Sequence, residues 1–424
     1  MPEITDLNAP LRRLTPPRGH FFFGYYDVPA ADAQDRHLCQ EVLFRDRFPT
    51  PEDVATIGHV PLPTPGAAEG DLPFTPFAET RAWNFQQGAM LQWLGGQSDT
   101  CLYNVFAGGR LGTCIHNLAS GARRVLPLPV ANVARDGTQA LCINLSRVYD
   151  FRPGYGYEEV PDPFADVLAP AEDGVSVMDL ATGRHRQVLS YAQLAEFLAR
   201  ERVLCEPRKL VVNHITFNPA GSRFMFLLRT FVTAPGQHWL TLLLTAATDG
   251  SDLRLHPTWD MASHYHWRND EELLIWTFTG PEKKGALVVI NDRTGERTVV
   301  DAGFFPNDGH CSYSPDGRWI LYDSYPDAST PDHLRWLGVY SLDRGAGCTL
   351  GRFRSEPIFR QTPTGLDKSN VDLRCDLHPR WMPDGQSITF DSIHEGYRGV
   401  YWMDLPDLAT RCGDVSQSQA ASVS

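Results

Sequence analysis

The chain has 424 residues, a formal net charge of −13 at pH 7 and an isoelectric point near 5.5. Binding to nucleic acid or to an anionic membrane requires a basic surface, so we expect neither partner for this acidic chain. Hydrophobic residues make up 42% and aromatic residues 11% of the sequence, which supplies a large core and favours β-sheet. The start lacks the apolar segment of a signal peptide, and no run of about 18 apolar residues occurs. We therefore expect a soluble protein of the cytoplasm.

Seven copies of one pattern follow one another along the chain, each an alternating apolar run, a turn rich in Asp, Gly or Asn, and a second alternating run. The copies are GYYDVPAADAQDRHLCQEV, QQGAMLQWLGGQSDTCLYNVF, PVANVARDGTQALCINLSRV, NHITFNPAGSRFMFLLRT, SHYHWRNDEELLIW, GHCSYSPDGRWILYDSYPD and LHPRWMPDGQSITFDS. Asp-Gly turns between alternating runs indicate β-hairpins, and further strand-like runs give roughly four strands per copy. Repeats of this kind are typical of a β-propeller.

We therefore predict an all-β fold, a single seven-bladed β-propeller over residues 21–405, with an N-terminal extension over 1–20 and a flexible C-terminal tail over 406–424. Residues 186–210 break the pattern, because their apolar residues have helical spacing, and predict a short helix inserted between the third and fourth blades. The segments 49–76 and 151–164 lack periodicity. We expect them to form long loops that cover one face.

The nine cysteines are an odd number and include no CxxC pair. This arrangement does not resemble a disulfide framework. We expect most of these cysteines to be buried, reduced thiols.

Histidine recurs at one position in four successive repeats, seven residues before a shared turn position. The four residues are His214, His264, His310 and His378. Side chains in a strand alternate between faces with period 2, so equal offsets from the turn predict equal directions. The four imidazoles are then expected to converge where the blades converge. The alternative is that the repeats share an ancestor and that each histidine merely caps its inner strand.

Within a propeller blade of the commonest kind, the start of the innermost strand and the end of the next strand meet at one rim. This geometry pairs His214 with Arg229, Gln87 with Asn104, His310 with Asp323 or Ser324, and His378 with Ser392 or His394. Arg147 and nearby Tyr149 are expected at the same rim, where propellers commonly bind ligands. Arg229 is equally expected to bridge two blades. Aromatic residues near the inner strands are expected to pack in the core, namely Tyr25, Tyr26, Trp267, Trp319 and Trp381.

The phrases YSPDGRWILYDS, WMPDGQSITFDS and FNPAGSRFMFLL resemble the TolB-type propeller blade. A larger part of the chain, from FFFGYYDVPAADAQDRHLCQEV through RAWNFQQGAMLQWL, SHYHW, DGHCSYSPDG and LHPRW, resembles the seven-bladed propeller polysaccharide lyases of the ulvan and oligogalacturonate lyase type. This resemblance implies β-elimination on uronic acid residues of an acidic oligosaccharide. It also implies His or Tyr as acid and base, Arg beside the substrate carboxylate, and a divalent metal ion held by propeller histidines.

Carried onto this sequence, the resemblance implies a metal set of His264, His310 and His378, with Cys375 as a further ligand and zinc or manganese as the ion. The catalytic set transfers less completely. Gln87 and Asn104 stand where early-blade histidines are expected, and His214 rather than a tyrosine precedes Arg229 at the expected interval.

The chemistry of elimination then suggests a role for each residue. The enolate that develops beside the carboxylate needs a cation, which Arg229 or a metal supplies. A neutral His214 can take the proton, and Tyr149 can serve the leaving oxygen. Further residues are expected around the substrate, namely Arg147, Gln87, Asn104 and His266. Two other functions remain open, a non-catalytic propeller that binds a glycan or a protein, and a glycoside hydrolase on the same scaffold.

Overall fold

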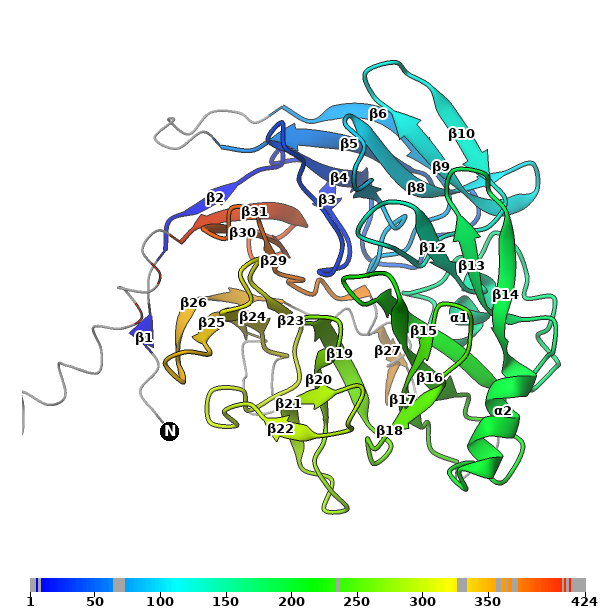
Figure 1. Cartoon of the computed structure of the whole chain (residues 1–424). Helices are drawn as coiled ribbons and strands as arrows, with labels where there is room; N and C mark the ends of the chain where they lie inside the picture. Colours follow the sequence, from blue (N-terminus) through cyan, green and yellow to red (C-terminus); the bar gives the residue numbers. More distant parts are fainter. Residues whose placement is uncertain are drawn as a thin grey trace, which may run out of the picture.

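The computed structural model describes residues 5–6, 9–63, 73–233, 237–325, 334–355, 360–362, 365–367, 373–405, 408 and 412. Seven sheets form the blades, six of four antiparallel strands and one of five in which the outermost strand is parallel to its neighbour. Figure 1 shows them arranged around a central axis, and the prediction of a seven-bladed propeller is confirmed. The sequence pattern explains the arrangement, because Asp-Gly and Asn-rich turns reverse the chain between alternating runs that each bury one set of side chains.

Blades one to six take their strands in chain order from the axis outward. Blade one consists of β3 His20–Phe22, β4 Arg36–Val42, β5 Ala55–Pro61 and β6 Thr75–Thr80. Blade two consists of β7 Gln92–Trp93, β8 Thr100–Ala107, β9 Arg110–Asn117 and β10 Arg123–Leu126. Blade three consists of β11 Asn132–Val133, β12 Gln139–Cys142, β13 Gly174–Asp179 and β14 His185–Ser190. Blade four consists of β15 Leu210–Phe217, β16 Arg223–Thr230, β17 Thr241–Ala247 and β18 Arg254–His256. Blade five consists of β19 Ala262–Trp267, β20 Glu272–Phe278, β21 Gly285–Asn291 and β22 Arg297–Val299. Blade six contains β23 Cys311–Tyr313, β24 Trp319–Asp323, β25 Leu334–Ser341 and β26 Ala346–Arg354.

The seventh blade is completed by the start of the chain. Its inner strands are β29 Arg380–Trp381, β30 Ser387–Ser392 and β31 Gly399–Asp404, and β2 Leu11–Arg13 pairs antiparallel with β31 as the outer strand. Strand β1, Thr5–Asp6, pairs parallel with β26 at the outside of the sixth blade. Residues expected in an N-terminal extension thus form strands of the propeller, which covers two open sheet edges and ties the ends of the ring together.

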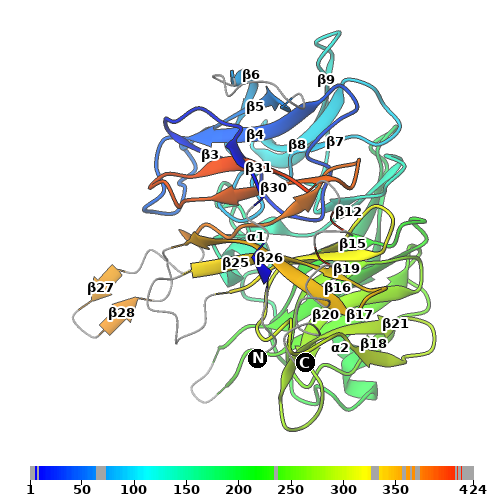
Figure 2. The same cartoon turned by 90° about the vertical axis from the view of Figure 1, so that its left-hand side faces the viewer.

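Two helices interrupt the blades. Helix α2, Tyr191–Arg200, lies between the third and fourth blades as predicted, and a capping box between Ser190 and Gln193 starts it. Helix α1, Leu145–Phe151, was not predicted, and it begins where the side chain of Asn144 accepts a hydrogen bond from the backbone of Arg147. A two-stranded hairpin, β27 Arg360–Thr362 with β28 Gly365–Asp367, stands away from the blades in Figure 2.

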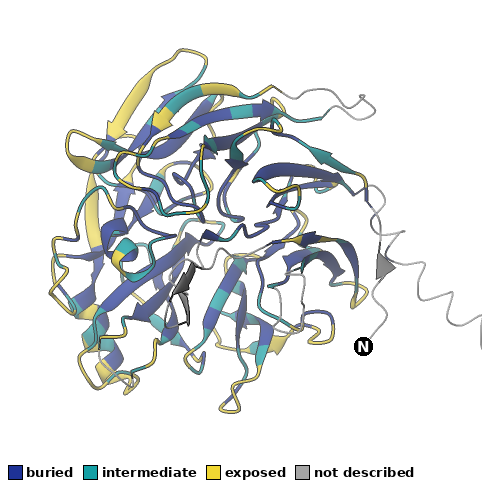
Figure 3. Cartoon of the chain, turned by 180° about the vertical axis from the view of Figure 1, so that it is seen from behind, coloured by how far each residue is buried: buried dark blue, intermediate teal, exposed yellow. Residues whose placement is uncertain are grey.

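The core lies between neighbouring blades. One hydrophobic cluster joins Leu227 and Leu243 of the fourth blade to Trp267 and Ile275 of the fifth. Figure 3 shows the consequence, with buried inner strands and exposure concentrated on outer strands and turns. The aromatic residues expected in the core belong to such clusters or pack against them, namely Tyr25, Tyr26, Trp267, Trp319 and Trp381.

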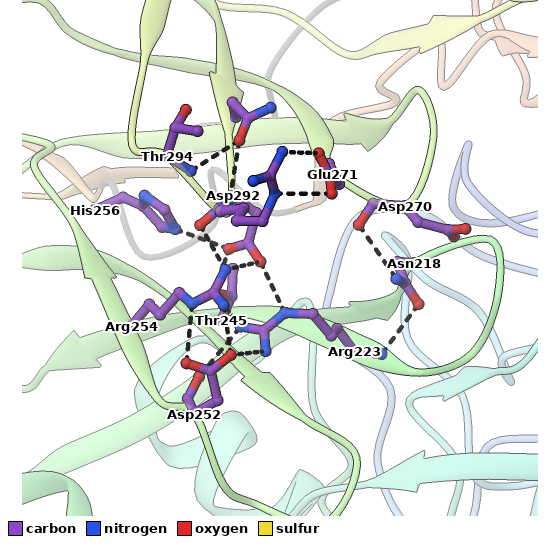
Figure 4. A network of polar contacts seen from close by, with 12 residues as sticks. Asn218, Arg223, Thr245, Asp252, Arg254, His256, Asp270, Glu271, Asp292 and Thr294 are labelled. Carbon is purple, nitrogen blue, oxygen red and sulfur yellow. Dashed lines mark hydrogen bonds and ion pairs between the residues drawn. The ribbon is translucent and has the colours of Figure 1, made fainter.

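A buried carboxylate, Asp292, joins the fourth and fifth blades through polar contacts that Figure 4 shows. It accepts hydrogen bonds from Arg223 Nε at 2.8 Å, Arg254 Nη1 at 3.1 Å, Thr245 Oγ1 at 2.5 Å and His256 Nε2 at 3.0 Å. Burial opposes its ionisation, but these partners lower the pKa of Asp292 to about 2. The carboxylate is therefore ionised at neutral pH and braces the interface.

The segment 49–76, expected as a loop, contains β5 and the start of β6, and its prolines Pro61 and Pro76 stand at the ends of β5 and β6. Most cysteines are reduced, as expected: Cys39, Cys101, Cys114, Cys142, Cys205, Cys311 and Cys375 are free, whereas Cys348 and Cys412 form a disulfide. Within the described part of the chain, no helix has the length and apolar character needed to cross a membrane.

Candidate active site

The four in-register histidines converge at the end of the axis where the inner strands begin. The ring centroids of His264 and His310 are 4.0 Å apart, and those of His310 and His378 are 4.3 Å apart. The ring of Tyr25 lies between His214 and His378, and its centroid is 5.0 Å from the centroid of each imidazole. The equal offset from the turn therefore predicted their meeting correctly.

Strained backbone aims two of these histidines. His214 has φ 64 and His378 has φ 43, a region that residues other than glycine seldom adopt. Pairing between β15 and β16 skips His214, because the register jumps from Asn213 to Ile215. Such bulges redirect a side chain, and left-handed backbone at a non-glycine residue costs about 1–3 kcal/mol. Backbone conformations that carry this much strain energy are found most often at functional sites.

A group of three buried side chains offers ligands for a metal ion. One ligand atom from each of His310, Asp376 and His378 lies within 4.8 Å of the other two. Three atoms of this group, His310 Nε2, His378 Nε2 and Asp376 Oδ2, have no hydrogen-bond partner among the described residues. Buried polar atoms without partners are costly, and two imidazoles with a carboxylate suit zinc or manganese. The donor set thus fits a divalent cation.

Outer contacts orient two of these ligands. Asp323 accepts a hydrogen bond from Nδ1 of His310 at 2.9 Å, which leaves Nε2 as the lone-pair nitrogen. Asp376 pairs with Arg335 at 2.5 Å and with Arg374 at 2.8 Å. Burial opposes the ionisation of Asp376, but the two guanidinium groups hold the pKa of its carboxyl well below the usual range.

Asp376 takes the place that the sequence analysis assigned to Cys375. The Cys375 thiol lies outside the ligand group and contacts the carbonyl of Asp376 at 3.8 Å, and burial raises its pKa to about 11. Asp376, not Cys375, therefore accompanies His378 in the ligand group. Residues 375–379 belong to no strand and His378 has a positive φ, so the period-2 rule of strands gave no signal for this carboxylate.

His264, the third predicted metal ligand, lies beside the group, with both ring nitrogens engaged. Nδ1 donates to Asp308 at 2.8 Å, which makes Nε2 an acceptor, and the hydroxyl of Tyr325 donates to Nε2 at 3.1 Å. Arg374 Nη2 donates to the same hydroxyl at 3.0 Å. Sequence reasoning missed Tyr325, although it follows Asp323 by two residues at the rim.

A pocket of about 470 Å³ opens next to these histidines. Its lining residues are Arg152, Tyr155, His214, Arg229, His238, Trp239, Thr241, Asp260, Met261, Ala262, Ser263, His264, Asp308, Tyr325 and Arg374. The guanidinium of Arg229 lies 5.1 Å from the ring centroid of Trp239, and that of Arg152 lies 4.2 Å from the ring of Tyr155. The predicted pair His214 and Arg229 therefore shares one pocket, which carries three guanidinium groups and aromatic surfaces.

His214 is neutral in this setting. Burial and the neighbouring guanidinium groups of Arg229 and Arg152 hold its pKa well below the ordinary value of 6.5. Its Nδ1 is buried without a hydrogen-bond partner among the described residues. A neutral imidazole beside an arginine can accept a proton at neutral pH.

Two residues expected at the substrate lie in helix α1 and outside the pocket lining. Arg147 is fully buried and donates hydrogen bonds to Asp162 and to the backbone oxygens of Phe164, Val167, Leu168 and Leu210. All five of its N–H groups are thus used to hold the segment after α1 against the fourth blade. Burial, followed by the effect of Glu158, raises the pKa of Tyr149 well above its usual value.

The other predicted substrate residues are also elsewhere. Asn104 is fully buried, and its amide is satisfied by Val130, Tyr157 and Thr113. Gln87 lines a small void that also borders His214, and it does not line the pocket itself. His266 faces the opposite mouth of the propeller. The segment 151–164 does reach the pocket, through Arg152 and Tyr155.

No family model and no curated protein matches this chain. Solved structures do resemble it. An oligogalacturonate lyase in complex with manganese aligns at a TM-score of 0.63 with 16% identity over 96% of each chain. An oligogalacturonate lyase from Vibrio parahaemolyticus aligns at a TM-score of 0.63 with 14% identity, again over 96% of each chain. At such identities the likeness establishes the fold alone, a seven-bladed propeller.

Proposed function

We propose that this protein is a metal-supported lyase that cleaves a uronate-containing oligosaccharide by β-elimination. The observation that carries the proposal is the buried group His310, Asp376 and His378, whose ligand atoms have no partner among the described residues. Two direct neighbours of this group, His264 beside His310 and Arg374 beside Asp376, line the pocket with three arginines. The resemblance to oligogalacturonate lyases, one of them a manganese complex, supports the same reading. The pocket lining carries three arginines against two aspartates, Asp260 and Asp308, and this positive balance in a chain of net charge −13 favours an acidic ligand.

His310, Asp376 and His378 would hold the metal ion. When bound, a divalent cation supplies positive charge to a substrate carboxylate and stabilises the enolate that forms there. Arg229 contributes charge of the same sign from the wall of the pocket, at the side of His214.

His214 would remove the proton from C5 of the uronate. Its neutral state at pH 7 and its place in the pocket beside Arg229 suit a general base. The electrons of the C5–H bond then form the C4–C5 double bond, and the bond between C4 and the glycosidic oxygen breaks.

Tyr325 would donate the proton that the departing oxygen needs. Burial raises its pKa well above 10, so the phenol stays protonated until reaction. Arg374 donates to the same oxygen and stabilises the phenolate that remains. Asp308 and His264 hold the hydroxyl in position. Tyr325 thereby replaces Tyr149 in the proposed mechanism.

The proposal is tested by incubating the protein and Mn²⁺ with galacturonate, glucuronate and guluronate oligosaccharides. A lyase product carries a C4–C5 double bond, so we expect ultraviolet absorbance to rise with the number of new reducing ends. New reducing ends without absorbance would instead identify a glycoside hydrolase. Binding without any product would identify a non-catalytic propeller.

A further inference from the structure

A second pocket lies at the other end of the propeller axis, where the inner strands end. Its volume is about 470 Å³, and residues of the turns that follow the inner strands line it, among them Pro219, Pro315 and Pro383. It shares no lining residue with the candidate active site. Tyr26, one of its lining residues, is anchored at the axis by hydrogen bonds between its hydroxyl and the backbone N–H and C=O of Tyr265.

The wall of this pocket includes a polar ring that five successive blades build at one register. The ring consists of the second-to-last residue of each inner strand from β7 to β23, namely Gln92, Asn132, Thr216, His266 and Ser312. The last residue of the same strands is apolar or aromatic, namely Trp93, Val133, Phe217, Trp267 and Tyr313. Two of these side chains join neighbouring blades, because Asn132 Oδ1 accepts a hydrogen bond from the backbone N–H of Phe217 at 3.0 Å and His266 Nδ1 accepts one from that of Tyr313. Burial of a polar side chain costs free energy unless its groups find such partners.

The ring offers hydrogen-bonding groups but no formal charge at neutral pH. Burial lowers the pKa of His266 to about 4, so its imidazole is neutral. Its Nδ1 accepts from the backbone N–H of Tyr313 at 3.3 Å, which places the ring proton on Nε2 as a donor. Ser312 is 4% exposed, and its Oγ has no hydrogen-bond partner among the described residues.

We propose that this polar ring is a second ligand site, which takes a neutral sugar residue. Hydroxyl, amide and imidazole groups both donate and accept, as the hydroxyls of a sugar require. The ring contains no cation, whereas the candidate active site has three guanidinium groups. The titratable or charged residues that line the second pocket besides His266 include Arg135, which is exposed, Arg268, which pairs with Glu272, and Asp27, whose pKa burial raises to about 7. The volume is within the range of pockets that enclose a small ligand.

The test compares two probes that differ mainly at C6, galactose and galacturonate, titrated into the full-length protein by calorimetry and by ligand-observed NMR. We expect galactose to bind, and we expect galacturonate to be unable to displace it from this pocket. Loss of one or two hydrogen bonds in His266→Phe or Ser312→Ala should weaken galactose binding by about fivefold. His214→Asn, at the other end of the axis, should leave galactose binding unchanged.

Three results would overturn the proposal. The first is the absence of galactose binding to the folded wild-type protein. The second is galactose binding that survives both His266→Phe and Ser312→Ala but fails in His214→Asn, which would place the sugar in the candidate active site. The third is preference for galacturonate, lost on substitution of Arg135, which would identify an anion site. None of these results depends on lyase activity.

Discussion

The imidazole rings of His310 and His378 lie with their centroids 4.3 Å apart, although the sixth and seventh blades supply them separately. Each keeps a buried Nε2 without a hydrogen-bond partner among the described residues, and Asp376 adds a carboxylate oxygen in the same condition. A shared divalent cation would give each of these two nitrogen atoms and one oxygen atom the partner that it lacks.

Metal binding should therefore depend on Asp376 and not on Cys375. Because a ligand that binds only the folded state raises stability, Mn²⁺ should raise the melting temperature of the wild-type protein. In Asp376→Asn we expect binding to weaken by about tenfold or more, by analogy with losses around metal sites. Cys375→Ser should retain wild-type affinity. Equal losses in both variants, measured by calorimetry with chelator-treated protein, would restore Cys375 as a ligand.

Replacement of His214 should abolish proton removal without unfolding the protein. Asparagine suits the positive φ of 64 at this position better than alanine does, so His214→Asn is the appropriate variant. Loss of a general base typically costs about 10²-fold or more in turnover. We expect this loss in kcat with a nearly unchanged melting temperature. An exposed histidine in the third blade, His185, provides the control as His185→Asn. Full activity in His214→Asn would move the base to another pocket residue.

Tyr325→Phe and Tyr149→Phe separate the two tyrosines. Of these two, Tyr325 lines the pocket and Tyr149 does not, and the hydroxyl of Tyr325 contacts His264 and Arg374. We expect Tyr325→Phe to lower kcat by about 10²-fold, as loss of a general acid does, and Tyr149→Phe to change it little. Substrates with an activated leaving group need less protonation, so they should recover part of the loss in Tyr325→Phe. The reverse order of effects would return the role of proton donor to Tyr149.

The polar contacts of Asp292 between the fourth and fifth blades should matter for the free energy of unfolding and not for turnover. Asp292→Asn leaves Arg223 and Arg254 without their buried counter-charge, which costs about 3 kcal/mol when a buried pair is broken. Asp252, whose side chain is 50% exposed, contacts the same two arginines. Asp252→Asn should therefore cost well under about 1 kcal/mol. Urea unfolding of both variants measures the difference, and similar losses would show that the buried carboxylate has no special role.

Stability should depend on pH through Asp27, at the axis. Burial raises the pKa of Asp27 from 3.8 to about 7. A folded-state pKa above the unfolded value means that the folded protein holds the proton more tightly, so this contribution is full below pH 3.8 and is lost as pH rises towards 7. Relative to Asp27→Asn, the wild-type free energy of unfolding should fall between about pH 4 and pH 7 and level off above that. A constant difference over this range would contradict the assignment.

The repeats alone predict much of this molecule. Turns at a fixed offset from alternating runs indicate both the seven blades and the convergence of His214, His264, His310 and His378, because strand periodicity and turn chemistry act between neighbours in the chain. Helix α2 was likewise visible in the spacing of its apolar residues.

The remaining features of the fold and of the candidate site depend on contacts between segments that are far apart in the sequence. Helix α1 replaces an expected strand end and buries Arg147 among backbone oxygens of the following segment, and no periodicity in the sequence records those partners. Strand β2 closes the seventh blade across nearly the whole length of the chain. Tyr325, His264 and Arg374 come from three segments that are far apart in the sequence, and the hydroxyl of Tyr325 makes a hydrogen bond with each of the other two. Sequence patterns determine which face a side chain takes, whereas packing of one blade against another determines which side chains meet.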